Sequence, residues 1–344
     1  MTKKQATLLE VQRLEVQFDT YGGVVKAVRG IDFSILPGET LAIVGESGCG
    51  KSVAVQSLLG LIPMPPGKLT GGDAVLESTV LIKDGQLTNN EIRGSRIGMI
   101  FQDPMSALNP TMTIGKQIAE PLEIHKGLTS KEALQEAIEL LNLVQIPQPH
   151  IRAKQYPHEF SGGMLQRAMI AMAIGCEPDL LIADEPTTAL DVTIQAQILN
   201  LISRMQKRNR MGLILITHDL GIVSKMADRV AVMYGGQIVE HGNMEEIFSR
   251  PSHPYNVGLQ SAMPSTARDS QSKLLPIEGS PPDLFNPPDG CAYATRCPHA
   301  MNICVKKEPD FFEIDASHYS KCWLHDPNAP KKVPSISYKE SLYD

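Results

Sequence analysis

Three short apolar runs stand out in the hydrophobic pattern of the chain, at residues 41–44, 180–183 and 213–216. Each run consists of Leu, Ile, Val or Ala and ends in a glycine or a polar residue, which is typical of a strand buried on both faces. Between the runs, segments such as residues 134–141 carry apolar residues at helical spacing. Buried strands that alternate with helices predict an α/β fold with a parallel sheet.

Other stretches of the chain have different patterns. Residues 8–35 alternate apolar and polar positions, which predicts antiparallel strands, and residues 73–100 return to strand-like composition. The pattern is helical over residues 112–175, where Thr-Ser-Lys-Glu at 129–132 is a capping-box sequence. Residues 229–241 predict two short strands joined by a Gly-Gly turn.

Proline marks a change of composition after about residue 250. Eleven of the 25 prolines fall in residues 261–344, and two Pro-Pro pairs in this part exclude long helices. We therefore predict a smaller, loop-rich domain over residues 256–344 that follows a larger domain over residues 1–255.

The residues that follow the first apolar run have the pattern Gly-x-x-x-x-Gly-Lys-Ser. Between a strand and a helix, this pattern is that of a phosphate-binding loop. Glycines let successive backbone N–H groups turn toward phosphate oxygens, and the helix start adds the positive end of its dipole. We expect Lys51 to reach the β- and γ-phosphates of a nucleoside triphosphate and Ser52 to bind Mg²⁺. The predicted nucleotide-binding residues of this loop are Gly45, Ser47, Gly48, Cys49, Gly50, Lys51 and Ser52.

Polar residues also follow the other two apolar runs. Asp184 and Glu185 come directly after one run, and His218 comes two residues after the other. Ligands bind at this edge of a parallel sheet, so we expect Asp184 to hold Mg²⁺ and Glu185 to polarise the attacking water. His218 would hold the γ-phosphate and that water. The alternatives are a helix N-cap or a solvated loop for the acids, and a structural role for the histidine.

A second candidate anion site lies at Ser161, Gly162 and Gly163, which begin a predicted helix. The alternative is a plain N-cap, which serine and glycine both favour. Because one triphosphate needs only one such helix start, this second one has no ligand of its own within the same chain.

In this order and context, these motifs resemble those of the nucleotide-binding subunits of ATP-binding-cassette (ABC) transporters, over residues 8–250. The resemblance implies a P-loop NTPase fold with a RecA-like core, an antiparallel β subdomain and a helical subdomain over about 105–178. It implies that Gln102 serves Mg²⁺ and the catalytic water, and that Asp191 belongs to the nucleotide site. Tyr21 would stack on adenine, with a solvated turn tyrosine as the alternative.

The resemblance also bears on assembly and on the transported solute. ABC subunits pair head to tail, so that each ATP lies between one subunit's phosphate loop and the other's Ser161-type helix start. Residues 101–110, the element His253-Pro254-Tyr255 and the proline-rich C-terminal part resemble the D-type ATPase subunits of oligopeptide and dipeptide importers. The generic ABC signature has glutamine at the position of Met164, and this departure also resembles the peptide-importer subfamily.

Such a subunit hydrolyses ATP as the motor of an importer. The resemblance implies a heterodimer with a sister ATPase, two membrane permease subunits and an extracellular peptide-binding protein. Import of another solute such as nickel is the alternative. A soluble ABC ATPase outside transport is less favoured, because those proteins carry two cassettes or long coiled-coil insertions that this chain lacks.

Four of the six cysteines, Cys291, Cys297, Cys304 and Cys322, lie close together in the sequence. Their gaps are longer than the tight pairs that structural zinc sites use, so zinc is the second choice. A [4Fe–4S] cluster tolerates varied spacing, and relatives in the peptide-importer family carry one here. Four unligated thiols are the remaining alternative, and Cys49 and Cys176 are expected only to fill space.

The bulk properties limit where the protein works. The net charge of −6 gives no sign of nucleic-acid binding. No apolar run approaches the length of about 20 residues that crosses a bilayer, and the N-terminus does not resemble a secretory signal. We therefore expect a peripheral protein on the cytoplasmic face of the cell membrane, which contacts the membrane only through its partners.

Overall fold

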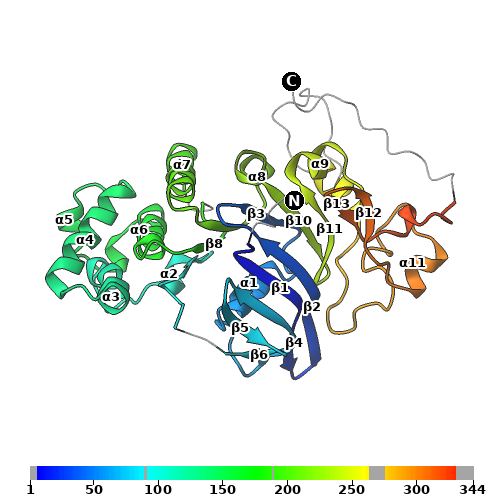
Figure 1. Ribbon diagram of the computed structural model, residues 1–344, viewed down its shortest axis with the longest axis horizontal. Coiled ribbons are helices and arrows are strands. Elements are labelled where there is room, and N and C mark those ends of the chain that lie inside the picture. Colours follow the sequence, from blue (N-terminus) through cyan, green and yellow to red (C-terminus); the bar gives the residue numbers. More distant parts are fainter. Residues whose placement is uncertain (1–5, 89–90, 188–189, 263–275, 331–344) are drawn as a thin grey trace.

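The structure is a computed structural model that describes residues 6–88, 91–187, 190–262 and 276–330. It consists of two β-sheets and a set of helices (Figure 1). The larger sheet has eight strands in the order β12-β13-β11-β10-β3-β9-β8-β7. In that order the strands are β12 (Phe312–Asp315), β13 (His318–Ser320), β11 (Gln237–Asn243), β10 (Arg229–Tyr234), β3 (Thr40–Val44), β9 (Gly212–Ile216), β8 (Leu180–Asp184) and β7 (Ile97–Ile100). The pairs from β10 through β7 are parallel, which confirms the predicted α/β core.

The second sheet is antiparallel and has the order β2-β1-β4-β5-β6. Its strands are β1 (Leu9–Thr20), β2 (Gly23–Ile35), β4 (Gly67–Leu76), β5 (Thr79–Lys83) and β6 (Gln86–Leu87). The inward side chains of β1 alternate with exposed ones, and they pack with α1 (Lys51–Leu58) and one face of the larger sheet in a single core. The alternation over residues 8–35 therefore predicted β1 and β2 correctly.

Apart from α1, the helices divide into a group at one end of the molecule and others that lie beside the larger sheet or, as α11 does, at the opposite end (Figure 1). The end group holds α2 (Pro104–Ala107), α3 (Ile114–Lys126), α4 (Ser130–Leu143), α5 (Pro149–Arg152), the 3₁₀ turn η1 (Pro157–Glu159) and α6 (Gly162–Ile174). The others are α7 (Val192–Asn209), α8 (Leu220–Met226), α9 (Met244–Ser249), α10 (Pro254–Ser261), α11 (Asn302–Lys306) and the 3₁₀ turn η2 (Trp323–His325). The predicted capping box is confirmed, because Thr129 and Glu132 cap α4 reciprocally. None of the helices in the described ranges is long and apolar enough to cross a bilayer.

The C-terminal part of the chain joins the larger sheet. Strand β13 pairs with β11, so the hairpin β12–β13 extends the sheet at its edge. Under this hairpin the fully buried Glu240 carboxylate accepts hydrogen bonds from the backbone N–H groups of Ser252 (2.7 Å) and His253 (3.0 Å) and lies 2.7 Å from His318 Nε2. These contacts attach the C-terminal hairpin to the segment that leads into α10.

Candidate functional site

The phosphate loop lies between β3 and α1, as the sequence predicts, and its glycines are required by its geometry. Gly45, Gly48 and Gly50 have φ values of 152°, 78° and 101°, in the region that side chains disfavour. A Cβ atom on Gly45 would lie 2.1 Å from the carbonyl oxygen of Met233, and one on Gly50 would lie 2.3 Å from that of Ala27. The loop is therefore packed too closely for a side chain at Gly45 and Gly50, whereas Gly48 is favoured by its backbone conformation alone.

Lys51 is buried within the loop, at the start of α1. Its ammonium group donates to the carbonyl oxygens of Gly45 (2.8 Å) and Glu46 (2.9 Å). Its nitrogen also lies 3.7 Å from the Cys49 sulfur, whose pKa is raised by burial and lowered in part by this lysine. The ammonium is thus held at the centre of the loop, where a bound phosphate chain would lie.

The buried carboxylate of Asp184, at the end of β8, fits a metal ion. Neither of its oxygens has a hydrogen-bond partner among the described residues. Burial raises the pKa of Asp184. The nearby Ser52 hydroxyl and the Lys51 ammonium partly offset this rise, although the Ser52 hydroxyl does not complete a hydrogen bond to the carboxylate. A buried carboxylate without a partner is costly, and the hard oxygen donors of Asp184 and Ser52 suit Mg²⁺. The residues present therefore fit the magnesium ion that the sequence predicts.

Three predicted catalytic side chains meet at the carboxyl ends of adjacent strands. The Glu185 carboxylate accepts a hydrogen bond from Gln102 Nε2 (3.2 Å) and lies 3.5 Å from His218 Nδ1. Glu185 is mostly buried and has a φ of +49°, whereas two thirds of the His218 side chain is exposed. The parallel order of β7, β8 and β9 brings these residues together, because each follows the end of a different strand.

The loop and Glu185 line a common pocket with a volume of about 370 Å³. Gln102 also lines this pocket, as predicted. The remaining lining residues were not found from the sequence: Phe18, Val25, Ala27, Val53 and Leu284. Leu284 comes from the C-terminal part of the chain, and its backbone oxygen accepts a hydrogen bond from Lys26 N (2.9 Å). No motif marks it, because its place depends on the path of a proline-rich segment across β2.

Three other predicted groups lie outside this pocket. Tyr21 is at the turn between β1 and β2, and its side chain is fully exposed. Ser161 is the N-cap of α6 without a side-chain capping bond, and a Cβ atom on Gly162 would meet nothing within 4 Å. Asp191 is the N-cap of α7 and accepts from Thr193 N (3.1 Å) and Ile194 N (3.0 Å). The structure therefore does not bring these groups to the phosphate loop of their own chain.

The four C-terminal cysteines are free thiols that lie near one another. Burial and, to a smaller extent, the charges of Cys291, Cys297 and Cys304 together raise the pKa of Cys322 to about 12. Burial also raises the pKa of Cys297 to about 11. Their sulfur donors suit a soft metal or a cluster. However, no group of three or more His, Cys, Asp or Glu side chains in the described residues is arranged as a metal site.

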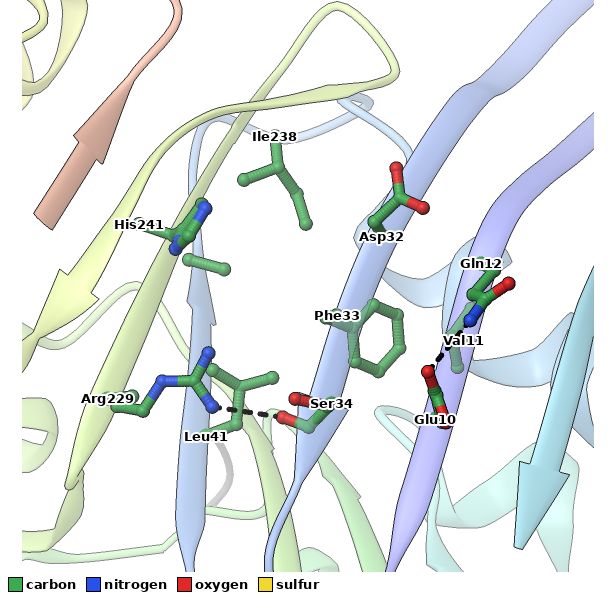
Figure 2. Close-up of a pocket in the computed structure, with 11 residues that line it drawn as sticks. Glu10, Val11, Gln12, Asp32, Phe33, Ser34, Leu41, Arg229, Ile238 and His241 are labelled. Carbon is green, nitrogen blue, oxygen red and sulfur yellow. Dashed lines mark hydrogen bonds between the residues drawn. The ribbon is translucent and has the colours of Figure 1, made fainter. Parts of the chain in front are cut away.

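A second cavity, of about 380 Å³, lies apart from the phosphate loop between the two sheets (Figure 2). Arg229 in its wall donates to the Ser34 carbonyl oxygen (3.1 Å) and pairs with Glu39 (3.0 Å). Burial lowers the pKa of His241, in the same wall, to about 4, so this histidine is neutral at pH 7. None of the predicted site residues lines this cavity, and its cationic side chain is already paired.

Comparison with known protein families gives two matches. Residues 28–188 match the family described as ABC transporter. Residues 239–304 match the family described as oligopeptide/dipeptide transporter, C-terminal region. The first match includes the phosphate loop and the carboxylates after β8, and the second includes three of the four clustered cysteines.

Whole-chain relatives agree with these matches. An oligopeptide transport ATP-binding protein of Bacillus subtilis is 53% identical over 97% of this chain and 94% of its own length. A dipeptide transport ATP-binding protein of the same organism is 52% identical over 97% of this chain and 99% of its own length. A solved dimeric ATP-binding cassette in a post-hydrolysis state, bound to ADP and phosphate, is 25% identical and superposes with a TM-score of 0.61, covering 69% of this chain and 98% of that one. From the phosphate loop, the site geometry and these matches, the chain belongs to the family of ABC transporter ATP-binding proteins and is an ABC-type ATPase.

Proposed function

We propose that the chain is the ATP-hydrolysing motor of an importer for oligopeptides or dipeptides. The observation that carries this proposal is the identity of about 50% over nearly the whole chain with proteins named for oligopeptide and dipeptide transport. The match of residues 239–304 to the C-terminal region of such transporters supports it independently of the ATPase core. In this proposal residues 1–255 form the ATPase domain, with the helical subdomain at about 105–178, and residues 256–344 form the C-terminal domain.

The side chains around the pocket have separate tasks in hydrolysis. Lys51 and the loop N–H groups hold the phosphates, while Ser52 and Asp184 would hold Mg²⁺, which neutralises phosphate charge. Glu185 accepts a proton from the attacking water, because its carboxylate lies in the wall of the pocket that the phosphate loop lines. Gln102 and His218 contact this carboxylate at 3.2 Å and 3.5 Å, and they orient it and the water.

The remaining predicted nucleotide-binding groups act on a second subunit. The helix start at Ser161, Gly162 and Gly163 is exposed or half-buried and lies outside the pocket of its own chain, as does Asp191. We infer that they complete the site of a sister ATPase, with which this chain forms a heterodimer. Two membrane permease subunits and an extracellular peptide-binding protein complete the transporter, and they hold the motor at the cytoplasmic face of the membrane. Tyr21 would approach the adenine from the rim of the site.

The test is peptide uptake by the transporter reconstituted in liposomes with its membrane subunits. Wild-type complex should couple Mg²⁺-dependent ATP hydrolysis to uptake of short peptides, and Glu185→Gln should lower hydrolysis by a factor of about 10²–10⁴. ATP binding should persist in this variant, since the Lys51 ammonium and the loop N–H groups that hold the phosphates are unchanged. The sister subunit carries the equivalent substitution in both samples, so that residual activity is assigned to one site. Uptake of nickel without uptake of peptides would contradict the proposed substrate, and full hydrolysis by Glu185→Gln would contradict the role of this residue.

We also propose that Cys291, Cys297, Cys304 and Cys322 hold a structural [4Fe–4S] cluster. Support comes from their mutual proximity and from the small amount of regular structure around them, which a cross-link would order. Because no group of three or more His, Cys, Asp or Glu side chains in the described residues is arranged to hold a metal ion, the thiols would have to rearrange to bind the cluster. The experiment is anaerobic purification with iron, sulfide and zinc assays. Stoichiometric zinc would favour the second choice, and protein that holds neither metal would contradict any metal site.

A further inference from the structure

Glu46, the second residue of the phosphate loop, is held through each of its polar groups. Its backbone N–H donates to the Tyr255 hydroxyl (2.7 Å), and its carbonyl oxygen accepts from Lys51 Nζ (2.9 Å). Its carboxylate forms a bidentate ion pair with Arg296, with distances of 2.7 Å and 3.0 Å. Two of these three partners, Tyr255 and Arg296, lie far along the chain and outside the nucleotide-binding motifs.

Arg296 is itself fixed in orientation. Besides its two bonds to Glu46, it donates to the Tyr234 hydroxyl (3.2 Å) and to the carbonyl oxygens of Glu278 (3.0 Å) and Ile277 (3.2 Å). These bonds engage all five donors of the guanidinium group, and only 5% of the side chain is exposed. The carbonyl acceptors belong to the C-terminal part of the chain, whereas Tyr234 ends β10 beside the loop.

We propose that Arg296 is a positioning residue of the ATP site, through which the C-terminal part of the chain holds the phosphate loop in its binding conformation. The planar guanidinium fixes the Glu46 carboxylate in two dimensions, which a lysine cannot do. Because the Glu46 carbonyl oxygen is bonded to the Lys51 ammonium, a shift of Glu46 moves the group that must meet the β- and γ-phosphates. The C-terminal part of the chain thereby contributes to the nucleotide site of the ATPase core.

The test compares ATP binding by the full-length chain and its Arg296→Met variant. We expect the Kd for ATP to rise about tenfold, because Glu46, and through it the Lys51 ammonium, is no longer preorganised for the phosphates. The number of binding sites per folded chain should stay at that of the wild type. A merely structural arginine would give the opposite result, with fewer binding sites and an unchanged Kd, because a part of the chains would be unfolded.

Four further variants make the test specific. Glu46→Gln keeps the loop and removes only the ion pair, so it should raise the Kd as much as Arg296→Met does, and the double variant should be no worse than either single one. Arg296→Lys should recover only part of the affinity. The matched control is Arg229→Met, because Arg229 forms a part-buried pair with Glu39 (3.0 Å) and does not contact the loop. Its Kd should equal that of the wild type.

Two results would overturn the proposal. One is an unchanged Kd in folded Arg296→Met, and the other is a rise of similar size in the Arg229→Met control. Where Arg296→Met does not fold, Glu46→Gln decides the matter alone, and an unchanged Kd in that variant refutes the positioning role. Binding is measured on the isolated chain, so the outcome is independent of which solute the transporter imports.

Discussion

His253 is fully buried, and its protonation is expected to destabilise the fold below neutral pH. Its Nδ1 atom caps α10 by accepting a hydrogen bond from Tyr255 N (3.1 Å), and its Nε2 atom has no partner among the described residues. A proton on Nδ1 would place two hydrogen-bond donors, Nδ1–H and the Tyr255 N–H, against each other, and it would remove the helix cap. Burial, the nearby charge of His325 and the partly opposing backbone contact of Lys321 leave the pKa of His253 lowered to about 3.

The size of the effect follows from this pKa. The unfolded chain has an ordinary histidine pKa of about 6.5, so between about pH 6.5 and pH 3 it binds a proton that the folded chain excludes. Stability therefore falls as the pH falls through this window. At pH 5 the penalty from His253 is about 2 kcal/mol, because each unit below 6.5 costs about 1.4 kcal/mol. The lowered pKa of His241 acts in the same direction.

The measurement is denaturant unfolding of wild type and His253→Asn at pH 7.5 and at pH 5. Asparagine keeps a capping acceptor but does not titrate, so the variant should lose about 2 kcal/mol less than the wild type on acidification. The control is His150→Asn on the surface, which removes a histidine without touching α10. An equal loss of stability in wild type and His253→Asn would refute the assignment of the buried neutral state to His253.

Three further predictions concern the nucleotide site. Gly50→Ala should abolish ATP binding, because its Cβ would lie 2.3 Å from the Ala27 carbonyl oxygen; calorimetric titration with ATP checks this, and retained affinity would contradict the tight packing of the loop. Leu284→Asp should weaken ATP binding by the isolated chain several-fold more than Tyr21→Ala does, since of these two residues only Leu284 lines the pocket. A larger loss of affinity in Tyr21→Ala would instead place the adenine base at the β1–β2 turn. Ser161→Arg should leave ATP binding by this chain intact and block hydrolysis at the partner's loop in the assembled transporter, and normal hydrolysis there would exclude the head-to-tail site.

Much of the nucleotide site was predictable because its chemistry is encoded in short segments. The four-residue apolar runs predicted β3, β8 and β9, and the residues that follow them had to meet where parallel strands end together. The contact between Gln102 and Glu185 and the approach of His218 follow from that order. The glycines of the loop were predictable for the same reason, since a backbone that turns around phosphates excludes side chains.

The sequence by itself thus determined the fold class and the phosphate loop, because local period and turn chemistry are sufficient to encode them. The tertiary structure alone decided that β13 pairs with β11, that Leu284 lines the nucleotide pocket, and that Tyr21 stays outside it. It also decided that Arg296 holds Glu46 across 250 positions of the chain. A hydrogen bond between such distant residues depends on how the whole chain packs, and no local pattern of apolar and polar positions records it.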